Sequence, residues 1–286
     1  MSHFVVLALG KDVYSMLEPY NENLEVEEYY DGEVSEEEKD NFIEYYKEFL
    51  EKEGRPFQSG LSKEEEMETL YKEFGMEWNG DSWRLADGIW CKYSTYNPLS
   101  KWDWYTIGGR FKDFFKIKPE AQNKENLTVS DIDFDGKIEE VKNRAKEDWE
   151  KANKAFNEAN TGNFKTWKDV INMKELSIDE QRELYNTQPE ILAYKKAFED
   201  RDLIPFFEML EDCLENKDEF INGRIYNQVA PFAYISKKTG WKEKGEMGWW
   251  GMSNDKYTGK EWHNEFMKFF KSLPKDMPVT IVDCHI

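Results

Sequence analysis

Two short apolar segments near opposite ends of this sequence constrain its fold more than any other feature. Residues Phe4–Leu9 and Val279–Cys284 are rich in β-branched and aliphatic side chains. Such runs are typical of strands buried in the interior of a sheet. Because neither run is long enough to be buried alone, we predict that the first and last strands lie in one sheet.

Between these strands the character of the sequence changes twice. Residues 76–118 are rich in Gly, Trp and Tyr and predict strands at 89–93 and 102–107, whereas residues 119–221 have helical spacing, with a long charged helix over 137–160. Strand signals return at 232–235 and 248–252, before a helix over 259–273. We therefore predict an α+β fold whose mostly antiparallel sheet is formed by the N- and C-terminal parts. Residues 1–118 and 222–286 would form one discontinuous sheet domain, and residues 119–221 an inserted helical arm.

Several local signals refine this plan. Ser35 and Ser62 each begin a capping box that predicts the start of a helix, and the acidic residues 22–38 are expected to form a solvated loop. The long helix of the arm carries a narrow apolar stripe, made of Val141, Ala145, Trp149, Ala152 and Phe156. A stripe that its own chain leaves uncovered is an association site, so we predict a homo-oligomer.

The sequence is strongly acidic. Its 286 residues include 39 Lys and Arg against 59 Asp and Glu, a formal net charge of −20. This charge repels nucleic acid and anionic membranes and favours basic partners. It is consistent either with a device for solubility or with a surface that occupies the basic DNA-binding groove of a partner. We expect no direct contact with nucleic acid.

The cellular setting follows from three further observations. No segment has the roughly 20 apolar residues of a membrane span, and the first residues lack the basic region of a signal peptide. The three cysteines, Cys91, Cys213 and Cys284, are widely spaced, which is typical of a reducing compartment. We expect a cytoplasmic protein without membrane contact, in which Cys284 is a candidate for a contact between chains.

No catalytic signature is present. The three histidines, His3, His263 and His285, are not part of a nucleophile motif. Cys284 and His285 point to opposite faces of the predicted last strand, and a zinc site there would need His3 and Cys91 as well. We therefore predict no catalytic residue, no metal and no cofactor, and we expect that the protein is not an enzyme.

An aromatic strand is the best candidate for a binding surface. Trp102 and Trp104 are expected on one face of it, with Asp103 and Tyr105 on the other and Arg110 just beyond. These residues form either a salt-bridged structural cluster or a site for a small ligand or a partner. We select as candidate binding residues Trp102, Asp103, Tyr105, Arg110, Trp249 and Trp250.

Four segments carry a resemblance to a family of largely uncharacterised proteins of bacteriophages and bacteria. They are His3–Leu9 with Pro19–Asn23, the Lys-Trp-Asp-Trp-Tyr segment Lys101–Phe111, the Glu-Lys-Gly-Glu-Met-Gly-Trp-Trp-Gly-Met segment Glu243–Met252, and Val282–Ile286. A weaker resemblance is to the phage Gabija anti-defence family. That resemblance implies an α/β body with projecting arms, which assembles around a host nuclease complex and blocks its DNA binding.

Together these observations predict a phage-encoded anti-defence protein that binds and sequesters a bacterial immune nuclease complex without catalysis. Because the acidic residues are taken to be spread along the chain, we expect steric enclosure of the target rather than mimicry of DNA. Two alternatives remain open. One is a small-ligand-binding module or enzyme with a pocket near Trp102–Arg110, and the other is a structural interaction protein.

Overall fold

The chain forms two compact units, which are described separately. A computed structural model describes residues 2–55, 57, 60–75, 77–78, 80–121, 126–199, 210–248 and 252–286. The large unit consists of Met1–Met16 and Tyr105–Ile286, and the small unit of Leu17–Trp104. The large unit is therefore discontinuous in sequence, whereas the small unit is one uninterrupted segment.

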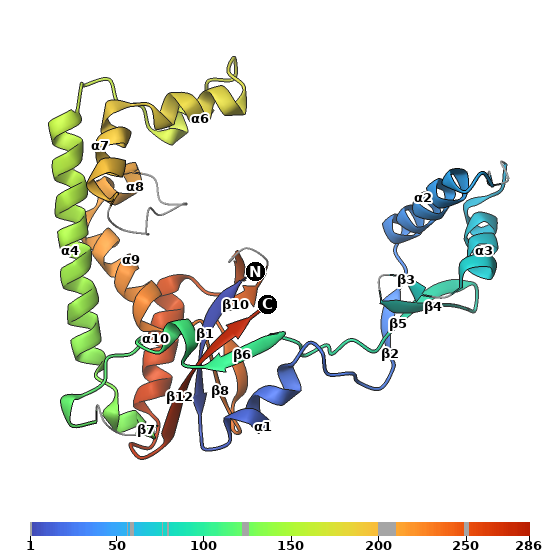
Figure 1. The fold of residues 1–286 in the computed structure, drawn as a ribbon, viewed down its shortest axis with the longest axis horizontal. Helices are drawn as coiled ribbons and strands as arrows, with labels where there is room; N and C mark the ends of the chain where they lie inside the picture. The colour runs from blue at the N-terminus through green and yellow to red at the C-terminus, as the bar shows by residue number, and fades with distance from the viewer. Residues whose placement is uncertain are drawn as a thin grey trace. The chain divides into compact units, whose positions relative to one another are not determined.

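The main sheet is organised by the pairing of the first and last strands. β1 (His3–Leu9) runs antiparallel to β12 (Pro278–His285), with His3 opposite His285 and Leu9 opposite Val279 (Figure 1). The prediction that both strands share one sheet is confirmed. All of β1 after His3 is buried, as expected for an apolar strand with a neighbour on each side.

The other strands extend this pair in both directions. The order is β6-β12-β1-β8-β9, and β7 also pairs with β12. Only β8 is parallel to β1, and β9 returns antiparallel to β8. The mixed α+β class with a mostly antiparallel sheet is thus confirmed. The added strands are β6 (Trp104–Ile107), β7 (Leu127–Thr128), β8 (Ala233–Ser236) and β9 (Gly240–Glu243).

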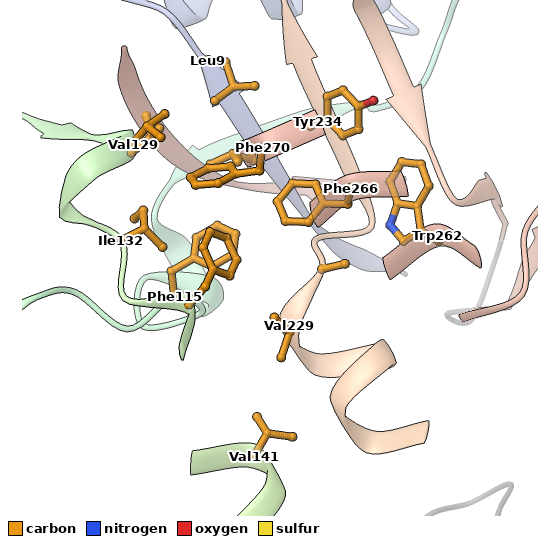
Figure 2. Packing of buried hydrophobic residues seen from close by; sticks show 14 residues of the cluster. Leu9, Phe115, Val129, Ile132, Val141, Val229, Tyr234, Trp262, Phe266 and Phe270 are labelled. Carbon is orange, nitrogen blue, oxygen red and sulfur yellow. The ribbon is translucent and has the colours of Figure 1, made fainter. Parts of the chain in front are cut away.

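An aromatic helix covers one face of this sheet. In α10 (Gly259–Lys271), Trp262, Phe266 and Phe270 follow one another at four-residue spacing and therefore share one side of the helix. All three are buried, and they pack against Tyr234 and Phe115 in the principal core (Figure 2). The helix predicted at 259–273 agrees with the structure.

The predicted helical arm is present within the large unit and has a core of its own. Its long helix α4 (Phe134–Ala159) runs beside α7 (Pro189–Ala197), α8 (Leu210–Glu215) and α9 (Lys217–Val229) (Figure 1). Of the predicted stripe, Val141, Ala145 and Ala152 are buried by this packing. The stripe is therefore covered within the chain, which removes the argument for association, and the homo-oligomer stays a prediction. The arm also contains α5 (Trp167–Ile171) and α6 (Ile178–Asn186).

The small unit has a separate sheet, which the sequence did not distinguish from the main one. Its strand order is β2-β5-β4-β3, and two helices pack on one face. The helices begin at the capping boxes of Ser35 and Ser62, as predicted. The boundaries expected at residues 118 and 222 stay a prediction. The elements are β2 (Tyr29–Glu33), α2 (Glu36–Lys52), α3 (Lys63–Phe74), β3 (Glu77–Trp78), β4 (Asp81–Ala86) and β5 (Ile89–Ser94).

The remaining elements are short. β10 pairs with β11 on either side of residues 249–251, so the strand predicted at 248–252 lies largely outside the described residues. No helix within the described ranges is long and apolar enough to cross a membrane. The short elements are α1 (Val13–Leu17), η1 (Glu18–Tyr20), η2 (Gly109–Phe111), η3 (Pro119–Ala121), η4 (Val129–Asp131), β10 (Gly245–Met247) and β11 (Ser253–Asp255).

Truncation of the central aromatic side chain of α10 is expected to destabilise the large unit. Phe266 is 0% exposed, so Phe266→Ala removes a buried ring and leaves a cavity, at a cost of about 3–5 kcal/mol. Urea denaturation followed by circular dichroism measures the loss. The exposed Lys268→Ala on the same helix is the control and should change the free energy of unfolding by less than about 0.5 kcal/mol. A Phe266→Ala loss as small as the control's would contradict this packing.

Candidate functional site

A buried polar cluster lies where β1 begins and β12 ends. The His3–Asp283 cluster consists of the side chains of His3, Asp283 and His285 and the backbone amide of Arg110. Asp283 is 2% exposed and His285 5%, and the His3 side chain is 11% exposed. Burial of so many polar groups is costly unless they bind one another, so their mutual contacts define the site.

The Asp283 carboxylate joins two segments of the large unit. One of its oxygens, Oδ1, lies 2.8 Å from His3 Nδ1, and the other, Oδ2, accepts a hydrogen bond of 2.9 Å from the Arg110 amide. The rings of His3 and His285 meet edge to face, with centroids 4.9 Å apart. A neutral His3 that donates from Nδ1 keeps its lone pair on Nε2, which is the tautomer of a general base.

Gly109 permits this arrangement. It begins η2 with a φ of +50°, and a Cβ atom at this position would lie 2.5 Å from the Cβ and Oδ2 atoms of Asp283. Any side chain would therefore displace the carboxylate or the η2 segment. The Gly-Gly pair after the aromatic strand thus allows close approach of the backbone to Asp283.

Cys284 lies on the opposite face of the same strand. It is 0% exposed, and burial, with the Asp283 charge as a second cause, raises the pKa of its thiol far above the ordinary value. Such a thiol is neither a nucleophile nor accessible to a second chain. The proposed inter-chain contact through Cys284 is therefore inconsistent with its position. Tyr105 lies close to this cysteine, and burial, more than the nearby Tyr14 and Cys284, raises its pKa.

The predicted aromatic site is divided between the two units. Trp102 lies in the small unit before β6, is 5% exposed, and donates from Nε1 to the Leu17 carbonyl at 3.2 Å, which is a structural role. Asp103 also belongs to the small unit and accepts from the Trp104 amide at 2.7 Å. Tyr105 and Arg110 belong to the large unit. The expectation that the strand begins at Trp102 is wrong, because regular pairing begins at Trp104.

Trp249 and Trp250 lie outside the described residues. Their neighbour Gly248 accepts a 2.6 Å hydrogen bond from the hydroxyl of Ser2, which is itself 2% exposed. The amide and carbonyl of Ser2 pair with those of Ile286 at 3.1 Å. Three of the segments singled out by the sequence thus meet at the His3–Asp283 cluster, and a fourth is attached beside it at Gly248. The three are His3–Leu9, Val282–Ile286 and, of Lys101–Phe111, the part 105–111 that belongs to the large unit.

No family model, curated protein or solved structure matches the chain. The site therefore has to be interpreted from its own chemistry. Among the described residues, no three His, Cys, Asp or Glu side chains are arranged to hold a metal ion. Cys91, one of the ligands considered for zinc, lies in β5 of the small unit.

The two units differ strongly in net charge. The 88 residues of the small unit hold 9 Lys and Arg against 24 Asp and Glu, a net charge of −15. The other 198 residues hold 30 against 35, a net charge of −5. The acidic residues are therefore found in both units, as expected, but the net charge is concentrated in the small unit, which the sequence analysis did not predict. Counting charges within segments would have found this signal in the sequence.

Part of this acidity is neutralised inside the small unit. Three of the four carboxylates in the first turns of α2 contact three lysines from α2, α3 and β5, at N–O distances between 2.6 and 2.8 Å. Burial raises the pKa of Glu38, but hydrogen bonds from Lys92 and Ser35 outweigh it and lower that pKa to about 2. The pairs are Glu36 with Lys39 and Lys63, Asp40 with Lys63, and Glu38 with Lys92.

A side chain at Gly109 should destabilise the large unit through its contact with Asp283. We predict that Gly109→Ala costs about 1–3 kcal/mol more than Gly162→Ala, measured by thermal denaturation. Gly162 is a matched control because it also has a positive φ, +78°, but a Cβ atom added there would have nothing within 4 Å. Backbone strain is then common to both variants, and equal losses would contradict the close approach at Asp283.

Removal of the Glu38 charge should weaken the small unit in a pH-dependent manner. The pKa of Glu38 in the folded protein, about 2, lies below its ordinary value of 4.5, so its charge stabilises the fold above pH 4.5, and the contribution is lost toward pH 2. Glu38→Gln keeps a capping side chain but not the charge. Amide exchange of α2, corrected for intrinsic rates, should reveal a loss of about 1 kcal/mol at pH 7 that disappears near pH 2. A loss independent of pH would exclude the charge as its cause.

Proposed function

We propose that this chain acts by binding a basic surface of a partner protein, with the small unit as its main binding part. The observation that carries this proposal is the net charge of −15 on 88 residues. A charge of this density attracts basic surfaces over roughly 8–10 Å at ordinary ionic strength and speeds association with them. It disfavours binding to nucleic acid and to anionic membranes.

The small unit also exposes aromatic side chains, which suit a binding surface and are not needed for solubility. Tyr30, Tyr45 and Tyr96 are each more than half exposed, and Phe49 is 41% exposed. Aromatic rings contribute large contact areas in protein interfaces and bind guanidinium and ammonium groups over their faces. Carboxylates and rings together suit a surface rich in Arg and Lys.

The specific form of the proposal is an anti-defence inhibitor in the cytoplasm of an infected bacterium. Its target would be the DNA-binding groove of an immune nuclease complex, and its action would need no catalysis. Two arguments support this form. DNA-binding grooves are basic, and an origin in a phage is expected from the resemblance of four segments to uncharacterised phage and bacterial proteins and from a separate, weaker resemblance to the Gabija anti-defence family. The uneven charge now favours competition with DNA for the groove over steric enclosure.

A second candidate function is the binding or conversion of a small ligand in the large unit. The specific observation in its favour is the His3–Asp283 pair, in which a largely buried carboxylate orients a histidine. A carboxylate–histidine pair serves as a general base in many enzymes. The same carboxylate also accepts from the Arg110 amide and so fastens β12 to the η2 segment, and a structural role therefore accounts for its burial equally well. Histidine NMR shifts measured on addition of a ligand would distinguish the two roles. A shift that occurs in the unmodified chain and is lost in Asp283→Asn would favour the ligand site, and the absence of such a difference would favour the structural role.

The proposed function predicts salt-sensitive competition with DNA. The purified full chain should inhibit DNA cleavage by a purified Gabija nuclease complex, and excess duplex DNA should relieve the inhibition. The inhibitory concentration should rise about tenfold or more between roughly 50 and 300 mM salt, because exposed charge pairs are screened. Absence of inhibition at low salt would refute the anti-defence form, and binding that neither DNA nor salt weakens would refute the electrostatic mechanism.

A further inference from the structure

The carboxylates of residues 22–33, in β2 and just before it, are mostly exposed and form few ion pairs. Residues 22–33 contain six Asp and Glu and no Lys or Arg. Five of the six carboxylates are exposed, and within the described residues only Glu28 forms an ion pair, with Arg84 at 2.6 Å. Three of the four carboxylates at the start of α2, in contrast, form ion pairs with three lysines of the same unit. The negative charge near β2 is therefore exposed and largely uncompensated within the described part of the small unit.

β2 is also an edge strand with one uncovered face. It lies at the end of the order β2-β5-β4-β3, so one of its edges has no partner strand within the small unit as described. Trp83 and Trp90 point toward α2 and α3, where they join the core of this unit. Tyr30 lies opposite Tyr93, and Tyr93 lies opposite Ser82. Because side chains alternate along a strand, these three residues point to the face opposite that of Trp83 and Trp90. They therefore occupy the face that neither helix covers.

This face already holds one arginine, contributed by the chain itself. The Arg84 guanidinium lies 4.6 Å from the centre of the Tyr93 ring and pairs with the Glu28 carboxylate. A ring and a carboxylate thus bind one cationic group together. This contact defines the ligand chemistry that the face accepts: a planar cation, stacked on tyrosine and paired with an acid.

Tyr30 and Glu33 repeat this combination at the exposed edge. Tyr30 is 55% exposed and meets Tyr93 edge to face, with ring centroids 5.9 Å apart. Glu33 lies opposite Cys91, two positions along β5 from Tyr93, and therefore shares the sheet face of Tyr30. Beyond them, Glu25, Glu27 and Asp31 add three exposed charges. An arginine of another molecule can therefore stack on Tyr30 and pair with Glu33 in the way that Arg84 stacks on Tyr93 and pairs with Glu28.

We infer that the edge formed by residues 25–33, with the Tyr30 face, docks an extended, arginine-rich segment of the partner. This inference rests on the proposed function and names the part of the small unit that performs it. A second copy of the chain is disfavoured at this edge because two acidic edges repel each other, which is also how charged edges prevent self-association. A nucleic acid is disfavoured for the same reason.

The first test uses a short peptide of alternating arginine and threonine and the intact chain. The variant Glu25→Lys, Glu27→Lys, Asp31→Lys, Glu33→Lys should weaken binding at least about tenfold, since four ion pairs are lost. Glu28 is retained because it holds Arg84. The control changes four exposed carboxylates of the large unit by the same charge, at Glu147, Glu158, Glu175 and Glu183. Equal weakening in both variants, or no binding by the unmodified chain, overturns the inference.

The second test isolates the ring. Tyr30→Leu should weaken binding about two- to fivefold, whereas Tyr30→Phe, which keeps the aromatic face, should bind like the unmodified chain. Peptide binding should also slow amide exchange in β2 and not in α2. Protection confined to α2, or equal affinities of the Leu and Phe variants, overturns the assignment of the site. Inhibition of the nuclease that persists in the β2 variant would refute this edge while leaving the proposed function intact.

Discussion

The pairing of β1 with β12 is the interaction on which the large unit depends. β12 connects to β6 and β7, and β1 connects to β8 and through it to β9. Without this pair the sheet would separate into two fragments, neither of which could cover the aromatic side of α10. The same register sets His3 opposite His285 and brings Asp283 within reach of His3 and of the Arg110 amide. One hydrogen-bonded ladder thus determines both the core and the polar cluster at its end.

Local signals in the sequence predicted most elements, but apart from the shared sheet of β1 and β12 they did not predict which elements pack together. The capping boxes at Ser35 and Ser62 specify helix starts because all of their contacts are local in the sequence. β2 was instead expected to be a loop, since Asp31, Gly32 and Glu33 disfavour strands and no apolar alternation marks an edge exposed on one face. The separate sheet of the small unit was missed because the sequence of a strand does not by itself determine which strand it pairs with. The cover of the α4 stripe was missed for the same reason: it comes from helices that follow much later in the sequence.

The candidate site followed a similar pattern. The sequence singled out the segment that contains Gly109 and Arg110, which lies beside Asp283 in the structure. It also named Trp102 and Asp103, which belong to the small unit, and it overlooked Asp283. Nothing local distinguishes this aspartate from the many other carboxylates, because its role arises from the register of β12 against β1 and from the close approach of Gly109. The total charge of −20 was visible from the start, whereas its concentration in one unit required the boundaries of that unit.

The discontinuity of the large unit bears on the order in which the chain folds as it is synthesised. The small unit is a single segment, so all of its strands and helices are present once Trp104 has emerged from the ribosome. β1 is made before it but cannot gain its antiparallel partner until β12, the last strand, has been synthesised. Contacts so distant in sequence form slowly, and an apolar strand that waits for them is prone to aggregation. The acidic small unit, folded first, would keep this nascent chain in solution while its sheet is still incomplete.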